Sequence, residues 1–285
     1  MKKILILGCK GMAGHMLYRN LPNLGEYDVY GAARNVGADP RIFNLDVSDV
    51  HKLEKIISEN SFDVVVNCIG ILNKDAEDHP EKAVWFNSYF PHLLAKITES
   101  TGTKVIHIST DCVFSGRRGN YTEEDSKDGV GFYAQSKALG EIANSKDITI
   151  RTSIIGPELN KNGIGLFNWF MMQPDNAILN GYVHAYWSGI TTLELSHVIH
   201  DVLQNEVTGL KQIAPSEKIS KYDLLKLFNE IYKDNSHAIS SYEDYSVDKS
   251  LCSTRKDYQY QTPDYKQMLL DMKDWIIKNK DLYPY

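Results

Sequence analysis

A glycine-rich turn near the N-terminus constrains this chain more than any other feature. Gly8, Gly11 and Gly14 follow a short apolar run at 2–7 and open an amphipathic stretch at 12–21. Glycines at this spacing, between a strand and a helix, allow a tight turn, a close approach of backbone N–H groups to a pyrophosphate, and close packing of helix on strand. The helix N-terminus adds unpaired N–H donors and a partial positive charge. The pattern favours a dinucleotide site over a plain strand–helix turn.

The alternation of strand and helix continues through the first half of the sequence. Apolar runs typical of buried strands alternate there with helical patterns. The strands are predicted at 27–32, 62–69, 104–109 and 148–155, and the helices at 47–59, 80–100 and 132–144. Strands joined in this way form right-handed crossovers and a parallel sheet that is covered on both faces. We therefore predict an α/β fold with a doubly wound parallel sheet of the Rossmann type.

The sequence changes character after Gly156-Pro157, where an aromatic and methionine-rich stretch begins. Three further amphipathic helices are predicted at 192–203, 220–232 and 264–279. No repeat, low-complexity tract or linker separates the two parts. We predict a dinucleotide-binding domain at residues 1–155, rejoined by part of 183–205, and a smaller α/β lobe at 156–285 that mainly binds substrate.

Composition limits the partners of the protein. The 285 residues include 31 Lys and Arg against 37 Asp and Glu, a net charge of −6, which argues against a nucleic-acid or anionic-membrane surface. No apolar stretch approaches the about 18 residues of a membrane span. The four cysteines lack close pairing and are typical of reduced thiols. We therefore predict a cytoplasmic protein that binds a small molecule.

A metal site is not expected. His197 and His200 lie three residues apart and could be ligands, but no cysteine or carboxylate is placed as a third one. A packed or solvated helix face is the favoured interpretation of this pair.

The end of the second predicted strand bears on the choice between NADP and NAD. A carboxylate that would bind the ribose hydroxyls of NAD is missing there, and Arg34 is present instead. A guanidinium can form paired hydrogen bonds with a 2′-phosphate. We therefore predict a preference for NADPH, with NADH as the alternative. The predicted cofactor contacts are Gly8, Gly11, Met12, Ala13, Gly14, Arg34, Asp46, Val47, Cys68, Ile69, Gly70, Tyr133 and Lys137.

A tyrosine and a lysine form the predicted reacting pair. Tyr133 and Lys137 are four residues apart on a predicted helix and therefore share one face. A phenol has an ordinary pKa of about 10, and a nearby ammonium would lower that pKa toward neutrality. Thr110 follows the strand at 104–109, and open α/β sheets bind their ligands at the carboxyl ends of strands. We predict that these three residues are catalytic.

Together these motifs resemble the extended short-chain dehydrogenase/reductase superfamily, and within it the dTDP-4-dehydrorhamnose reductase family. The resemblance rests on Gly8-x-x-Gly11-x-x-Gly14, Val66-Asn67-Cys68-Ile69-Gly70, the segment from Ser109 to Gly116, Tyr133-x-x-x-Lys137 and Arg151-Thr152-Ser153. It implies transfer of a hydride from NADPH to the C4 ketone of a nucleotide-linked 4-keto-6-deoxy sugar, for cell-surface polysaccharide biosynthesis. It also implies that Tyr133 gives the proton, that Lys137 lowers the pKa of Tyr133 and holds the nicotinamide ribose, and that Thr110, beside Asp111, binds the reacting oxygen.

Two departures from the family pattern bear on the substrate. Cys112 stands where the related sugar dehydratases carry a glutamate, which argues against dehydration. Ile154 stands where the reductases carry a tryptophan, so a UDP-linked N-acetylated 6-deoxy-4-ketosugar is an alternative substrate. The resemblance implies the substrate contacts Thr110, Asp111, Ile154, Trp187, Lys249 and Arg255. The aromatic residues near Trp187 could equally form the lobe core or a subunit contact.

Two other functions are compatible with the same motifs. A non-catalytic, NADP-binding regulatory subunit, like the one that regulates methionine adenosyltransferase, would keep the fold but would not need both Tyr133 and Lys137. A nucleotide-sugar epimerase would keep NAD bound and consume none. The chain could also form a homodimer.

Overall fold

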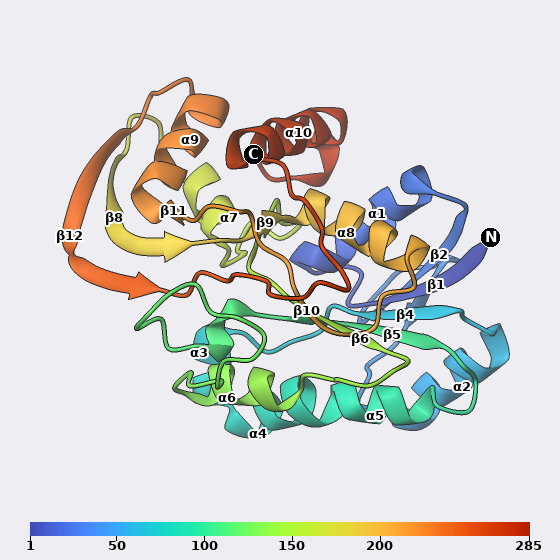
Figure 1. The fold of residues 1–285 in the computed structure, drawn as a ribbon. Coiled ribbons are helices and arrows are strands. Elements are labelled where there is room, and N and C mark those ends of the chain that lie inside the picture. The colour runs from blue at the N-terminus through green and yellow to red at the C-terminus, as the bar shows by residue number, and fades with distance from the viewer.

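A seven-stranded parallel sheet forms the centre of the structure, a computed structural model that describes residues 1–285 (Figure 1). Its strands lie in the spatial order β10-β6-β5-β4-β1-β2-β3. They are β1 (Lys2–Leu7), β2 (Tyr27–Ala33), β3 (Ile42–Asn44), β4 (Val64–Asn67), β5 (Lys104–Ser109), β6 (Ile148–Arg151) and β10 (Gly209–Gln212). The doubly wound α/β class predicted from the sequence is confirmed.

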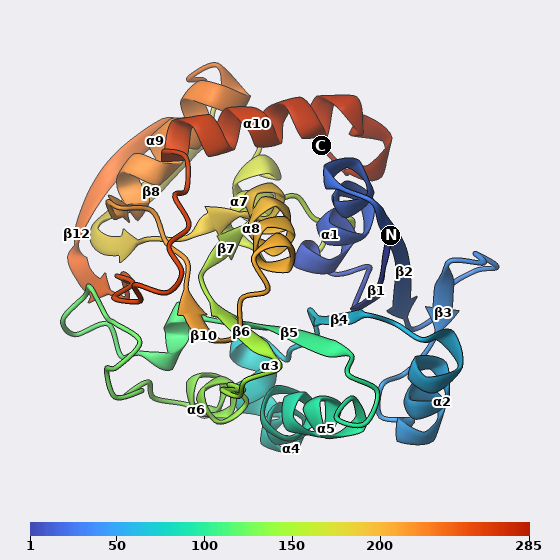
Figure 2. The same ribbon diagram turned by 45° about the vertical axis from the view of Figure 1, so that its right-hand side comes forward.

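Helices cover both faces of this sheet (Figure 2). One face carries α1 (Met12–Leu24) and α8 (Thr192–Gln204), and the other carries α2 (Val50–Asn60), α5 (Phe90–Ile97) and α6 (Phe132–Leu139). The alternation of side chains along β1 explains this arrangement, because Ile4 and Ile6 pack in one hydrophobic cluster and Leu5 and Leu7 pack in the other. A strand that is buried on both faces reads as a continuous apolar run, as 2–7 does.

The order of the strands creates a switch point beside β1. The chain leaves β1 toward β2 and β3, then crosses back to form β4 on the other side of β1. The turn after β1 and the segment after β4 are therefore neighbours, and the Cys68 N–H donates to the Leu7 carbonyl at 3.1 Å. Open α/β sheets bind ligands at such a point, outside the carboxyl ends of the strands.

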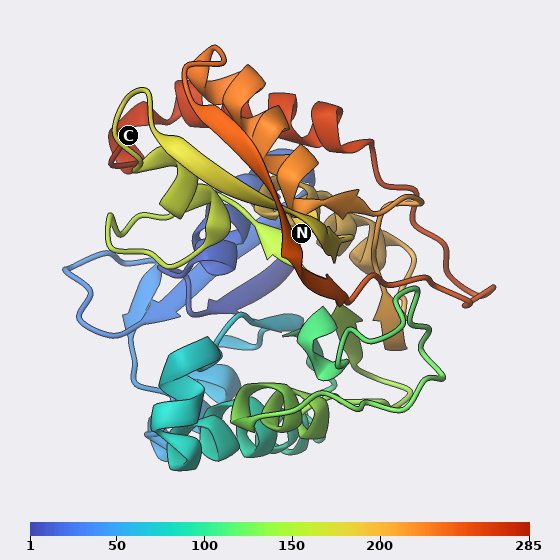
Figure 3. The ribbon, with the colours of Figure 1, turned by 90° about the vertical axis from the view of Figure 1, so that its left-hand side faces the viewer.

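A smaller lobe is built on a second sheet of three strands. It contains β8 (Ile178–Trp187), β11 (Ile219–Ser220) and β12 (Ala238–Asp248), and Figure 3 shows β8 and β12 running side by side. The helices α7 (Leu166–Met171), α9 (Lys221–Lys233) and α10 (Tyr265–Lys278) and the 3₁₀ turn η3 (Lys280–Leu282) belong to this part, and β7 (Ile154–Ile155) and β9 (Ile190–Thr191) pair with each other.

The chain returns from the lobe to the large sheet through α8 and β10. Helix α8 packs on α1, and β10 pairs with β6. The predicted returning segment, 183–205, is therefore displaced at both ends. Its first residues belong to β8, which ends in the lobe at Trp187, and the returning segment continues past 205 through β10. None of the helices combines the length and the apolarity needed to cross a bilayer.

Three predicted elements are shorter or more divided than expected. The predicted strand at 148–155 consists of β6 and β7, which belong to different sheets. The predicted helix at 80–100 consists of α4 (Pro80–Ala83), a π-helical segment η1 (Val84–Tyr89) and α5. The predicted helix at 132–144 ends at Leu139 with Gly140 as its C-cap, and the Ile142 N–H bonds to the Thr149 hydroxyl at 2.9 Å instead of continuing the helix. A short helix, α3 (Asn73–Asp78), lies between β4 and α4.

Candidate active site

The glycine turn after β1 has the geometry of an anion-binding loop. Gly8 has φ +80°, and a Cβ on Gly14 would lie 2.2 Å from the Gly8 carbonyl oxygen, so only glycine fits there. Gly11 is the N-cap of α1, and neither a capping side chain nor an acidic residue occupies its first turn. The first N–H groups of the helix, at Met12 and Ala13, are therefore available to an anion. The turn fits a dinucleotide pyrophosphate.

Charged side chains lie at the ends of β2 and β3. The Arg34 guanidinium is 3.8 Å from the Asp46 carboxylate, and the Arg34 side chain is 72% exposed. Hydrogen bonds from the backbone and hydroxyl of Ser48 lower the pKa of Asp46. Val47 beside it is buried. Sequence reasoning missed Lys10, whose ammonium donates to the Asn35 carbonyl at 3.3 Å and places a second cation beside Arg34.

The segment after β4 is fixed by two asparagines. The Asn67 side chain accepts from the Ile69 N–H at 3.1 Å, and Asn87 of η1 accepts from the Ile71 N–H at 2.8 Å and donates to the Ile71 carbonyl at 2.9 Å. A Cβ at Gly70 would lie 3.3 Å from the Asn87 side-chain oxygen. The role of Asn87 was not predicted, because a polar residue inside a helical stretch carries no local signal of what it will contact.

Helix α6 holds Tyr133 and Lys137, as predicted. The Lys137 ammonium donates to the Ile108 carbonyl at 2.7 Å, and burial lowers the pKa of Lys137 to about 8. Exclusion of water raises the pKa of Tyr133 above its usual value, and the Thr110 hydroxyl acts in the opposite direction. The expectation that Lys137 lowers the pKa of Tyr133 is therefore not met. Burial disfavours the phenolate, and the ammonium is bound to a carbonyl.

Thr110, Asp111 and Cys112 lie beside Tyr133. The Thr110 hydroxyl donates to the Asp111 carboxylate at 3.0 Å and accepts from the Cys112 N–H at 3.1 Å, which caps the short helix η2 (Asp111–Val113). Burial, with a smaller effect of Asp111, raises the pKa of Cys112 to about 11, so this thiol is neutral. Helix η2 packs against α6, and Thr110, Asp111 and Cys112 all act on the pKa of Tyr133.

The remaining predicted substrate contacts are spread over the lobe. Lys249 lies close enough to Cys112 to oppose the rise in the pKa of that thiol. Arg255 forms an ion pair with Glu124 at 3.0 Å. Ile154 packs against the core on the α1 side of the sheet. Trp187 is only 6% exposed, in the lobe core, and its indole N–H donates to the Ser153 hydroxyl at 2.9 Å. This placement gives Trp187 a packing role.

Glu77, which sequence reasoning also missed, caps the helix that carries Tyr133. Its two carboxylate oxygens accept from the Phe132 and Tyr133 N–H groups, each at 3.1 Å. Glu77 belongs to α3, so this contact ties the segment after β4 to the start of α6. Gly131, just before the helix, has φ +90°, and a Cβ there would lie 2.6 Å from the Glu77 carboxylate.

Replacing Glu77 by alanine is expected to destabilise the protein by about 0.5–2 kcal/mol, the usual effect of removing a helix N-cap. Urea unfolding would measure the loss. Glu81→Ala is the control, because Glu81 is an exposed acid of α4 whose carboxylate lies 3.7 Å from His79 and caps no other helix. Equal effects of the two substitutions would contradict the capping role.

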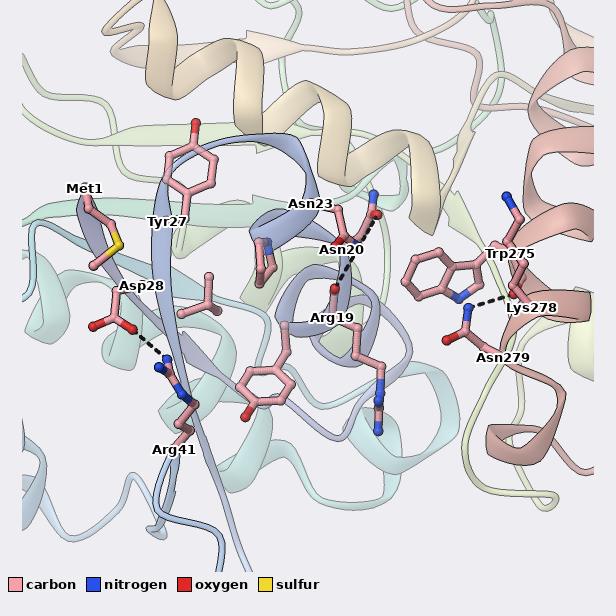
Figure 4. Close-up of a pocket in the computed structure, with 13 residues that line it drawn as sticks. Met1, Arg19, Asn20, Asn23, Tyr27, Asp28, Arg41, Trp275, Lys278 and Asn279 are labelled. Carbon is pink, nitrogen blue, oxygen red and sulfur yellow. Dashed lines mark hydrogen bonds and ion pairs between the residues drawn. The ribbon is translucent and has the colours of Figure 1, made fainter.

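A separate groove of about 790 Å³ lies elsewhere, at the other end of α1 (Figure 4). Arg19, Tyr27 and Trp275 contribute to its lining, and Arg41 donates there to the Asp28 carboxylate at 2.5 Å. None of the predicted site residues lines this groove. No three His, Cys, Asp or Glu side chains are grouped as a metal site would require.

The doubly wound sheet, the glycine turn and the Tyr133–Lys137 helix define an extended short-chain dehydrogenase/reductase. Residues 1–225 match the family model described as the RmlD substrate binding domain, and the chain belongs to this family. The resemblance found in the sequence is thereby confirmed.

Named relatives cover part of the chain. It is 32% identical over 166 residues to a dTDP-4-dehydrorhamnose reductase from Burkholderia thailandensis, covering 56% of this chain and 52% of the relative. It is 31% identical over 141 residues to methionine adenosyltransferase 2 subunit beta from Danio rerio, covering 49% and 42%. The chain thus spans about half the length of the curated relatives it matches. A solved structure of a hypothetical dTDP-4-dehydrorhamnose reductase from Sulfolobus tokodaii is similar with a TM-score of 0.78 and 26% identity, over 95% of this chain and 99% of that one.

Proposed function

We propose that this protein is an NADPH-dependent reductase of the C4 ketone of a nucleotide-linked 4-keto-6-deoxy sugar, acting in polysaccharide biosynthesis. The observation that carries the proposal is the packing of η2, which follows the carboxyl end of β5 with Thr110 and Asp111, against α6, which carries Tyr133 and Lys137. Membership of the RmlD family and the likeness to the reductase from Burkholderia thailandensis support the substrate class.

The residues around the switch point would hold the cofactor. The glycine turn and the N-terminus of α1 would bind the pyrophosphate, and Arg34 with Lys10 would bind the 2′-phosphate. The segment from Cys68 to Gly70 would lie against the adenosine ribose, and Lys137 would hold the nicotinamide ribose. NADPH, when bound, would supply the hydride.

The pKa values suit proton donation by Tyr133. Because the pKa of Tyr133 is raised, its phenol keeps its proton at neutral pH and can give it to the oxygen of the ketone as that oxygen gains charge. Lys137, with a pKa of about 8, is mostly charged at neutral pH and would stabilise the same charge. Thr110 would have to turn its hydroxyl from Asp111 to the sugar oxygen in order to donate to it.

The direct test supplies the protein with NADPH and a freshly prepared dTDP- or UDP-linked 4-keto-6-deoxy sugar. The nicotinamide absorbance should fall in step with formation of the reduced sugar, and the preferred nucleotide should give the larger kcat/KM. Absence of NADPH oxidation with every such sugar would contradict the proposal. An epimerase would instead isomerise the sugar with no net loss of NADPH.

Arg34→Ala is expected to raise KM for NADPH about tenfold, corresponding to about 1.4 kcal/mol for lost hydrogen bonds to a charged phosphate. KM for NADH should not change, because NADH lacks the 2′-phosphate. Arg41→Ala serves as the control, since Arg41 pairs with Asp28 in the separate groove. A parallel rise of both KM values would show that Arg34 has no role in choosing the cofactor.

A regulatory subunit is the second candidate, favoured by the likeness to methionine adenosyltransferase 2 subunit beta. Such a protein would bind the dinucleotide and a partner enzyme, and would not need a proton donor. Retention of the biological role in cells that carry Tyr133→Phe would favour it over the reductase. The homodimer also stays a prediction, which the molecular mass in solution would test.

A further inference from the structure

A buried carboxylate lies just beyond the end of the catalytic helix. The Glu141 side chain is only 3% exposed and follows Lys137 by four residues. It accepts from the Ser109 hydroxyl at 2.8 Å and from two nitrogens of Arg151 at 2.8 and 2.7 Å, and it is 3.1 Å from the Lys127 ammonium. Three hydrogen bonds and one ion pair therefore fix the position of this carboxylate.

Arg151 is held as firmly as Glu141. It is 1% exposed, donates to the Gln212 side chain at 2.9 Å, and places its guanidinium 4.9 Å from the centre of the Phe114 ring. A buried ion pair of this kind contributes little net stability compared with an apolar pair of the same size, because both charges lose their hydration. Its presence beneath the catalytic helix therefore suggests a role other than stabilisation.

The surroundings of Lys137 show what that role could be. Lys137 and Glu141 bind consecutive residues of β5, because the Lys137 ammonium donates to the Ile108 carbonyl and the Glu141 carboxylate accepts from the Ser109 hydroxyl. Three titratable groups interact electrostatically with Lys137: Cys68, His107 and Glu141. Burial raises the pKa of Cys68 to about 12, so its thiol is neutral. Burial also holds the pKa of His107 well below its usual value, so its imidazole is neutral. Glu141 is the one anion among these three groups.

We propose that Glu141 is a positioning residue for the reaction, and that its charge, oriented by Arg151 and Ser109, maintains Lys137 as an ammonium ion bound to the Ile108 carbonyl. The inference rests on the proposed function, in which the charged Lys137 holds the nicotinamide ribose. Glu141 itself, engaged by Ser109, Arg151 and Lys127, would contact neither the cofactor nor the sugar.

The test is the pH dependence of NADPH affinity in Glu141→Gln, followed through the fluorescence of the reduced nicotinamide. Affinity should fall at alkaline pH as Lys137 loses its proton, near pH 8 in the unaltered protein. An anion stabilises the ammonium, so its removal lowers the pKa of Lys137. The alkaline fall in affinity should therefore move to lower pH by about one unit. Well below that range, the two proteins should bind NADPH equally.

Two variants separate charge from packing. Glu141→Asp keeps the charge but disturbs the contacts with Arg151. The pH at which its NADPH affinity falls should stay close to that of the unaltered protein. Glu123→Gln neutralises another buried carboxylate, which binds Ser253 and Thr254 and does not act on Lys137. The pH at which the NADPH affinity of Glu123→Gln falls should be the same as in the unaltered protein.

The outcomes are distinct. A shift of the pH at which NADPH affinity falls, seen in Glu141→Gln alone, supports the proposal. The proposal is overturned if Glu141→Gln, Glu141→Asp and the unaltered protein show the same pH dependence. It is also overturned if Glu123→Gln shifts as much as Glu141→Gln. If Glu141→Gln does not fold, Glu141→Asp decides, since a shift of about one unit with the charge retained would overturn the proposal. Because the readout needs no sugar, a protein that binds NADPH but reduces no sugar still tests Glu141. A protein that binds no NADPH overturns the proposed function and this inference together.

Discussion

Tyr133→Phe is expected to lower kcat for sugar reduction by about 10²–10⁴-fold, the usual contribution of a positioned general acid. The ring remains, so NADPH affinity should be almost unchanged. Only the proton is lost. Thr110 can donate a hydrogen bond to the ketone oxygen but cannot supply this proton, because an aliphatic hydroxyl is a much weaker acid than a phenol. Steady-state rates at saturating NADPH, with affinity measured separately by fluorescence, would establish both points.

Tyr182→Phe provides the matched control for this experiment. Tyr182 lies on β8 of the lobe, is 39% exposed, and packs beside Tyr242 and Tyr245. Loss of its hydroxyl should leave kcat unchanged. If Tyr133→Phe kept most of its activity, the proton would have to come from another group, and the assignment of Tyr133 would be wrong.

Arg151→Met is expected to lower the free energy of unfolding by about 3–5 kcal/mol, because it leaves the Glu141 carboxylate buried without its main partner. Urea unfolding measures the loss. Arg118→Met is the control, since the Arg118 side chain is 59% exposed and its pair with Asp125 should contribute less than about 1 kcal/mol. A loss in Arg151→Met no larger than that of the control would contradict the importance of the buried pair.

The same substitution should change how stability depends on pH. In the unaltered protein, hydrogen bonding and charge from Arg151 outweigh burial and hold the pKa of Glu141 below its usual value. The pair therefore stabilises the fold at pH values above those at which a carboxyl ordinarily titrates, and this stabilisation is lost as the pH falls. Without Arg151, burial dominates and raises the pKa of Glu141. The folded variant then binds a proton more readily than the unfolded chain, so its deficit in stability should shrink as the pH is lowered.

The sequence was sufficient to predict the class of the large sheet and most of its strands, but not its edge strand β10. The run at 2–7 and the glycines after it gave the position of the turn, because the requirement for glycine at Gly8 and Gly14 is local and depends on backbone geometry. The predicted strands and helices alternate along the chain as the structure does. Boundaries were less accurate where a tertiary contact ended an element early, as at Gly140.

Features that depend on packing between distant segments could not be predicted. The pKa of Tyr133 follows from how much water its neighbours exclude, and the spacing of Tyr133 and Lys137 contains no information on that. Glu77 and Phe132, which Glu77 contacts at the start of α6, are 55 positions apart in the chain. The sequence around Trp187 is compatible both with a ligand contact and with a core residue, and only the fold places Trp187 in the lobe core.

The interleaving of sheet and lobe limits how such a protein can be divided. Because the chain forms β8 before it returns through α8 and β10, the edge strand of the large sheet is synthesised after part of the lobe. A fragment ending at residue 155 would lack α8, whose Leu195, Val198 and Ile199 share a cluster with Leu17 of α1. Such a fragment would expose that apolar surface. A foreign lobe therefore cannot replace this one through a fusion at a single junction, because the exchanged piece must leave the segment from α8 to β10 in place.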